Sequence, residues 1–154
     1  MVCSCRDCGL TVSDEGPDCQ AMFDELCTRQ PGAPFTYAVR RMLVDTYCLQ
    51  HPDRYCASAK SLAAHLTGLH CAMEHHSQPS VLEAQRRWLD GKPPLEKPAL
   101  PAFRGSLTLA DAYRAEDAVS LVAAVERWAR STWQAYATLH AVARGWTEQA
   151  LRRR

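Results

Sequence analysis

Two cysteines near the start of the chain have the spacing of a metal-binding knuckle. Cys5 and Cys8 are separated by two residues, and Gly9 follows directly. In this arrangement two thiolates can close on one tetrahedral ion, while the glycine permits the tight turn beyond them. Two thiolates are only half of a tetrahedral ligand set, so at least two more ligands must come from elsewhere in the chain.

Cys19 and His51 are the predicted remaining ligands. Cys19 stands at the start of a predicted helix, whose N-terminus favours the thiolate form. His51 precedes Pro52 at the end of another predicted helix, and a ring at such a boundary can point back toward the knuckle. The alternative role for this histidine is to cap the last carbonyl groups of its helix. The predicted metal ligands are therefore Cys5, Cys8, Cys19 and His51.

The predicted ion is Zn²⁺. Isolated knuckles of this kind usually bind zinc, which imposes no redox demand. An iron–sulfur cluster would also use four thiolates, but the dense C-x-x-C-x-x-C runs of the familiar ferredoxins are absent from the sequence.

The remaining cysteines have other possible roles. Cys3 adjoins the knuckle and could exchange with Cys5 or Cys19 as a ligand. Cys71 and His75 are four residues apart on one predicted helical face, as metal-binding pairs often are, although this histidine also precedes a polar loop and could simply be exposed. The others are interpreted as ordinary buried thiols: Cys27, Cys48 and Cys56.

Two further histidines lie on predicted helices. His65 occupies an apolar helical face, where an imidazole needs a partner, so it is either a satisfied core histidine or a ligand. His140 accompanies an aromatic group that could line a small-molecule pocket, although aromatic core packing explains the same pattern. The group consists of Trp128, Trp133, Tyr136 and Trp146.

Apolar residues repeat with helical spacing over much of the chain after residue 17. Asp18 is a predicted N-cap, and prolines at positions 31 and 52 end the first two helices. A segment with four prolines follows the fourth helix and is predicted to cross the surface as an ordered loop or to act as a flexible lid. The predicted organisation is one domain over 1–154, with a knuckle at 1–17, four helices within 18–91, the loop at 92–106 and C-terminal helices within 107–151.

The C-terminal region carries a heptad pattern. From Val122 to Trp146, apolar residues recur alternately every three and four positions, which predicts the longest helix of the chain. Its seam could pack inside the bundle or against a second copy of the chain, forming a homodimer. No strand-like alternation stands out, so the predicted fold is an all-α bundle of about five helices with an N-terminal zinc-knuckle-like segment.

Composition and charge disfavour several partners. The formal net charge is +1, with 18 Lys and Arg against 17 Asp and Glu, and no polybasic strip is present, so nucleic acid is not the predicted partner. No apolar run approaches the roughly 20 residues that span a bilayer, so no membrane partner is predicted. The glycine-rich phosphate loop, the nucleophile elbow and the dinucleotide fingerprint are absent. A small molecule or another protein is left as the partner.

The N-terminal sequence and the cysteine content together indicate the cellular compartment of the chain. The first 30 residues lack the apolar core of a signal peptide, so the chain is predicted to be cytoplasmic. In a reducing cytosol, eight cysteines indicate metal ligands and buried thiols rather than a disulfide framework. A secreted disulfide protein is the alternative.

Several motifs resemble those of one known family. The opening C-x-x-C-G and Cys19 with Phe23 four residues later are two of them. The most specific is the segment 45–52, DTYCLQHP, which is similar to D-x-Y-x-x-Q-H-P. The likeness continues in His65-Leu66 and in a tryptophan-rich helix over 133–146. The family is an uncharacterised bacterial one, catalogued as domain of unknown function 5946.

The chain also departs from this family. Arg40-Arg41 stand where the family often has a histidine, and Leu139-His140 stand where it has a histidine pair. A ligand set that used those positions would be incomplete here. Because the family has no activity to carry over, the resemblance sharpens the candidate residues without supplying a reaction.

Two functions fit these features. In the first, the four ligands fill a structural zinc site, and the helical body presents a pocket or partner surface as a binding or accessory protein. In the second, three ligands leave one position open, and the chain is a metal-dependent enzyme acting on a small molecule. The acid or base of that enzyme would be Asp45, His65 or His140. The lack of a recognised catalytic motif favours the first.

Overall fold

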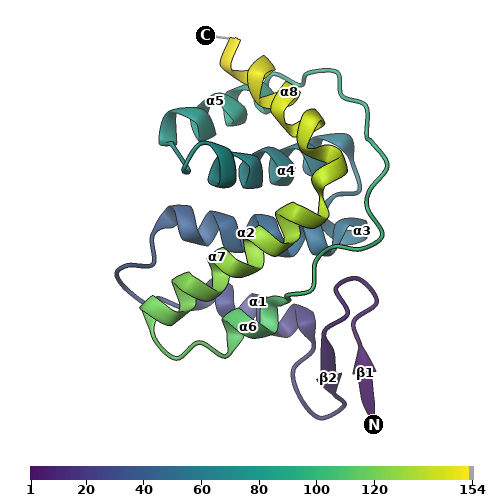
Figure 1. Ribbon diagram of the computed structural model, residues 1–154, viewed down its shortest axis with the longest axis vertical. Helices are drawn as coiled ribbons and strands as arrows, with labels where there is room; N and C mark the ends of the chain where they lie inside the picture. The colour runs from purple at the N-terminus through teal and green to yellow at the C-terminus, as the bar shows by residue number, and fades with distance from the viewer. Residues whose placement is uncertain (153–154) are drawn as a thin grey trace.

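The computed structural model in Figure 1 describes residues 1–152. These residues form eight α-helices, one short 3-10 helix and a two-stranded hairpin. The mainly helical fold agrees with the prediction, although the helices are more numerous and shorter than expected. The predicted domain, 1–154, includes Arg153 and Arg154, which lie outside the described residues.

The N-terminal segment is a β-hairpin, which the sequence did not predict. Strands β1 (Val2–Ser4) and β2 (Thr11–Ser13) pair antiparallel, and Cys3 faces Val12 across the ladder. The connecting loop holds the C-x-x-C-G motif. It is closed by two backbone hydrogen bonds, from the Cys5 N–H to the Leu10 carbonyl (2.8 Å) and from the Gly9 N–H to the Cys5 carbonyl (2.9 Å). Gly9 has φ of +78°, which explains why glycine follows the second cysteine.

The first five helices lie between the hairpin and the proline-rich segment, and side chains cap the N-termini of several of these helices. Asp18 accepts a hydrogen bond from the Ala21 N–H (2.8 Å), as predicted, and Ser58 forms a reciprocal capping box with Ser61. The second helix ends at Gln50, directly before His51, which also agrees with the prediction. The helices are α1 (Cys19–Thr28), α2 (Tyr37–Gln50), α3 (Pro52–Tyr55), α4 (Ala59–Glu74) and α5 (Pro79–Asp90).

The prediction of one long C-terminal helix over 122–146 is wrong. The chain instead forms α6 (Leu109–Tyr113), α7 (Ala118–Ala135), the 3-10 turn η1 (Ala137–Leu139) and α8 (His140–Arg152). Helix α7 packs against α2 and α6, whereas α8 packs against α4 and α5 (Figure 1). The chain turns at Tyr136, whose hydroxyl donates to the carbonyl of Leu49 in α2. The apolar seam is continuous because both helices bury it, but each buries it against different partners.

The predicted aromatic group belongs to the core. Trp128 and Tyr136 are fully buried, and Trp133 and Trp146 are nearly so. The heptad seam is therefore covered within the chain itself. Whether the chain also forms a homodimer stays a prediction.

The proline-rich segment between α5 and α6 runs along the surface without helix or strand (Figure 1). Its far end is tied to the core by the buried amide of Gln50, whose Nε2 donates to the carbonyls of Arg104 (3.0 Å) and Leu107 (2.8 Å). The indole N–H of Trp128 donates to the Gln50 Oε1 (2.9 Å), so this amide is well satisfied. The segment therefore crosses the surface as predicted, and its alternative role as a flexible lid stays a prediction.

The turn after α4 contains two consecutive residues with positive φ, His76 (50°) and Ser77 (55°). Residues other than glycine are strained at positive φ. We expect His76→Gly to raise the free energy of unfolding by about 0.5–1 kcal/mol, because relief of this strain exceeds the added entropy of the unfolded chain. Urea denaturation measures the change. Ser80→Gly, in the first turn of α5, is the control and should lower stability instead.

Candidate metal centre

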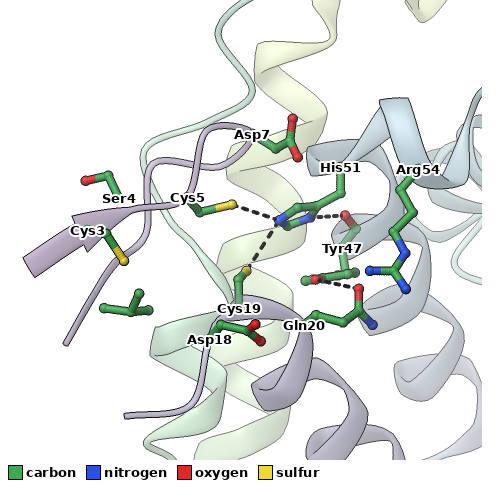
Figure 2. A pocket seen from close by; sticks show the side chains of 11 residues that line it. Cys3, Ser4, Cys5, Asp7, Asp18, Cys19, Gln20, Tyr47, His51 and Arg54 are labelled. Atoms are coloured by element: carbon green, nitrogen blue, oxygen red, sulfur yellow. Dashed lines mark hydrogen bonds between the residues drawn. The ribbon is translucent and has the colours of Figure 1, made fainter. Parts of the chain in front are cut away.

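The four predicted ligands come together at the junction of the hairpin and the helical body. Cys5 and Cys8 come from the hairpin loop, Cys19 is the first residue of α1, and His51 links α2 to α3. Their ligand atoms all lie within 4.8 Å of one another. Figure 2 shows the sulfurs of Cys5 and Cys19 directed at the His51 ring. Residues distant in sequence thus form one compact donor cluster.

The spacing of the donor atoms suits a tetrahedral ion. The Sγ atoms of Cys8 and Cys19 are 3.6 Å apart, and Nε2 of His51 lies 3.3 Å from the Cys19 sulfur and 3.6 Å from the Cys5 sulfur. Zn–S and Zn–N bonds of usual length, about 2.3 and 2.0 Å, place two sulfurs about 3.8 Å apart and a sulfur and nitrogen about 3.5 Å apart. All eight cysteines are free thiols. The donor set therefore fits zinc without a large rearrangement.

Backbone and aromatic contacts orient the His51 ring. Its Nδ1–H donates to the carbonyl of Tyr47 (2.8 Å), which leaves the lone pair of Nε2 facing the sulfurs. The ring also stacks on Tyr47 (centroids 4.0 Å apart), which in turn stacks on Phe23 (3.9 Å). The two roles predicted for His51 are thus compatible, because one nitrogen binds a carbonyl of α2 and the other faces the cluster.

The thiols interact strongly with one another. The Cys19 thiol donates a hydrogen bond to Cys8, which lowers the pKa of Cys8 to about 4. The same hydrogen bond raises the pKa of Cys19, and burial raises the pKa of Cys5. One thiolate is therefore favoured while its neighbours hold their protons, since like charges at this distance repel. A divalent cation would supply the positive charge that lets all three ionise.

A hollow of about 260 Å³ opens beside the cluster. Cys5, Cys19 and His51 line it, whereas Cys8 does not. Its other lining residues include Cys3, Gln20, Tyr47 and Arg54, drawn in Figure 2. One face of the donor cluster is therefore accessible.

The other predicted ligand candidates lie elsewhere. His65 donates from Nδ1 to the Asp45 Oδ1 (2.9 Å), which confirms its interpretation as a satisfied histidine. His140 stacks on Trp133 (3.9 Å) and bonds through Nε2 to the carbonyl of that residue (2.7 Å). Neither histidine, nor Asp45, lines the hollow. The acid–base residues predicted for an enzyme are therefore absent from the candidate centre.

The remaining cysteines also stay apart from the donor cluster. Cys71 is buried with its thiol toward the Gln78 carbonyl (3.9 Å), and among residues 1–152 neither it nor His75 belongs to a group of three or more metal-type donors. Cys48 and Cys56 are buried as predicted, while Cys27 is only half-buried. Cys3 lies outside the four-residue cluster although it lines the hollow.

Tyr47 has a role that sequence reasoning did not assign, although the residue lies in the motif segment 45–52. It supplies the carbonyl for His51, the ring on which that imidazole stacks, and a hydroxyl that donates to the Gln20 Oε1 (3.3 Å). The available signal was spacing, because Tyr47 precedes His51 by one helical turn.

We expect Tyr47→Ala to weaken metal binding by about 10- to 100-fold, because His51 loses the ring that orients it. The same change should cost about 3–5 kcal/mol of stability through the cavity it leaves. Competition with a chromophoric chelator measures the affinity. Tyr47→Phe is the matched control, since it keeps the stacked ring and the backbone carbonyl and should change affinity far less. Equal losses in the two variants would contradict a role for the ring.

The fold and the site together define a helical protein with a candidate centre of three cysteines and one histidine. The chain belongs to the Family of unknown function (DUF5946), whose match covers residues 3–137 and so includes all four donors. Comparisons with curated proteins and with solved structures find no match. Within residues 1–152, no helix has the length and apolar character needed to span a membrane.

Proposed function

We propose that the chain binds one Zn²⁺ through Cys5, Cys8, Cys19 and His51 and that this ion is structural in a binding or accessory protein. The observation that carries the proposal is the convergence of four donor atoms within 4.8 Å from three separate segments. Thiolate and imidazole donors favour zinc over magnesium or calcium, which prefer oxygen. Four protein ligands complete a tetrahedral shell, as in structural sites.

The small number of other contacts between the hairpin and the helical body supports the structural role. Every residue of β1 is exposed, and β2 is largely so. Apart from the cluster, the hairpin loop contacts the body through buried Leu10 and through Arg104, whose guanidinium donates to the Asp7 carbonyl (3.2 Å). An ion bound by the cluster would link this weakly attached hairpin to α1 and α2. Metal binding and local folding are then coupled.

The same proposal includes a cytoplasmic location. A reducing compartment keeps thiolates available for zinc and accounts for eight free cysteines. The partner would be a small molecule or another protein, with neither nucleic acid nor a membrane involved, and a homodimer is compatible with it.

The hollow supports a second candidate function. It exposes the face of the cluster formed by Cys5, Cys19 and His51, where a substrate could approach a catalytic ion. A metal-dependent enzyme would use this opening. We favour the structural role because Asp45, His65 and His140 do not line the hollow.

Elemental analysis of the purified chain tests the proposal. We expect one zinc per chain in the native protein, loss of that zinc in Cys19→Ser, and full retention in the control Cys27→Ser, whose thiol lies outside the cluster. Cobalt substitution then separates the two candidate functions. Azide should leave the cobalt spectrum of a closed four-ligand site unchanged, whereas it should change the spectrum of a site with an open position. A native protein without a stoichiometric ion, or a zinc-loaded Cys19→Ser, would overturn the proposal.

A further inference from the structure

The accessible face of the donor cluster gives a route to the ion. Cys5, Cys19 and His51 line the hollow, while Cys8 lies away from it. In a tetrahedral site, a donor that enters through this face approaches the ion between the three ligands that line the hollow. Zinc can become five-coordinate transiently, so an exchange of its ligands can begin by such an approach.

A fourth sulfur, that of Cys3, lines this hollow beside the three sulfurs and one nitrogen of the donor cluster. Cys3 lies on β1 two residues before Cys5, and side chains at alternate positions of an extended strand share one face. Val12, its partner across the hairpin, lines the hollow as well. The Cys3 thiol is exposed, is free, and has no side-chain hydrogen bond within the described chain (Figure 2). It is therefore close to the candidate centre without belonging to it.

Few contacts hold the β1 strand that carries Cys3, although Leu10 and Val12 of the same hairpin pack against the core. All three residues of β1 are exposed, and its only strand partner within residues 1–152 is the short β2. An isolated two-stranded hairpin is marginally stable, so a shift that brings the Cys3 sulfur onto the ion breaks few contacts. The short tether to Cys5 also keeps the effective concentration of this thiol high.

We infer that Cys3 is an exchange ligand, which replaces Cys5 on the ion through the hollow and thereby sets how fast the metal is released or transferred. In this step a bond forms between the Cys3 sulfur and the ion, and the thiol proton passes to water. The bond from the ion to Cys5 breaks, and the Cys5 thiolate takes up a proton from water. A donor from a chelator or an acceptor protein then displaces Cys3 from the ion by the same route, and the Cys3 thiolate takes up a proton from water. The inference rests on the proposed metal site.

Transfer of zinc to excess 4-(2-pyridylazo)resorcinol, followed by stopped-flow absorbance, tests this role in the full zinc-loaded chain. We expect Cys3→Ser to slow the transfer by roughly tenfold, because a tethered thiol acts at an effective concentration in the millimolar range. Zinc content and melting temperature should stay unchanged, since Cys3 is exposed and lies outside the cluster. Millimolar β-mercaptoethanol should restore the lost rate.

A second variant keeps the thiol but moves it to the other face of the strand. Val2→Cys combined with Cys3→Ser should transfer zinc as slowly as Cys3→Ser alone, because the residue 2 side chain does not line the hollow. An unchanged rate in Cys3→Ser would overturn the inference even if zinc is bound. Loss of zinc from Cys3→Ser would also overturn it, since Cys3 would then be a resident ligand. A native chain without zinc would instead defeat the proposed function itself.

Discussion

Removal of the ion by a chelator is expected to lower the melting temperature by about 10 °C. An ion present at a thousand times its dissociation constant stabilises the folded state by about 4 kcal/mol. For a domain of this size, each kcal/mol shifts the melting temperature by about 2–4 °C. The effect is large because the ion would link the hairpin, which has few other contacts with the helical body, to α1 and to the end of α2.

Thermal melts followed by circular dichroism, with and without EDTA, measure this shift. Hydrogen exchange should locate the loss of protection in residues 1–17 and in the first turn of α1, while the body built on α2, α4 and α7 keeps its protection. His51→Ala should melt at or below the temperature of the chelated wild type, because it also loses the stack on Tyr47, and should not respond to EDTA. A wild-type melting temperature that EDTA leaves unchanged would contradict a structural ion.

The candidate site could be predicted because its signals are local. Cys5 and Cys8 are marked by their spacing and by Gly9, which adopts the positive φ that the turn needs. Cys19 and His51 both lie at helix boundaries that Asp18 and a following proline make visible. The orientation of His51 could not be predicted, because it depends on a stack that also requires Phe23 from α1. The hollow likewise results from tertiary packing alone.

The errors in the fold have a common cause. The strands of the hairpin are three residues long and mostly exposed, so no alternation of apolar and polar residues marks them. The break between α7 and α8 has neither glycine nor proline at Tyr136. It depends on a hydrogen bond from Tyr136 to Leu49, 87 residues earlier in the chain. Neither feature has a sequence periodicity that predicts it, because the strands are too short to show one and the break is set by a distant contact.

The contact between α2 and α4 contains a buried ionic group. Asp45 is almost fully buried, accepts from His65 (2.9 Å), and lies 3.7 Å from the Arg41 guanidinium. Burial raises the pKa of this carboxyl, and its two partners offset part of that effect. Gly68 in α4 makes the room, because a methyl group at that position would overlap the Asp45 carboxylate and come within 2.9 Å of its Cγ. A glycine inside a helix is thus explained by the side chain it faces.

Gly68→Ala is therefore expected to lower the free energy of unfolding by about 3 kcal/mol, because the added methyl must displace a buried, hydrogen-bonded carboxylate. Urea denaturation measures the loss. Gly145→Ala is the matched control, since this glycine also lies within a helix but has no atom within 4 Å of the place that the added methyl would occupy. There the change should stabilise the protein by about 0.5–1 kcal/mol through helix propensity and reduced unfolded-state entropy.

A double-mutant cycle with Asp45→Ala identifies the cause. The shorter side chain removes the clash, so Gly68→Ala in that background should cost little or should stabilise, giving a coupling energy of about 3 kcal/mol. Asp45→Ala alone should itself be destabilising, because it leaves His65 and Arg41 without their buried partner. Additive effects of the two substitutions would mean that Gly68 is required for some reason other than the Asp45 carboxylate. Since Asp45 and Gly68 lie outside the candidate metal centre, zinc content should be the same in every folded variant of this cycle.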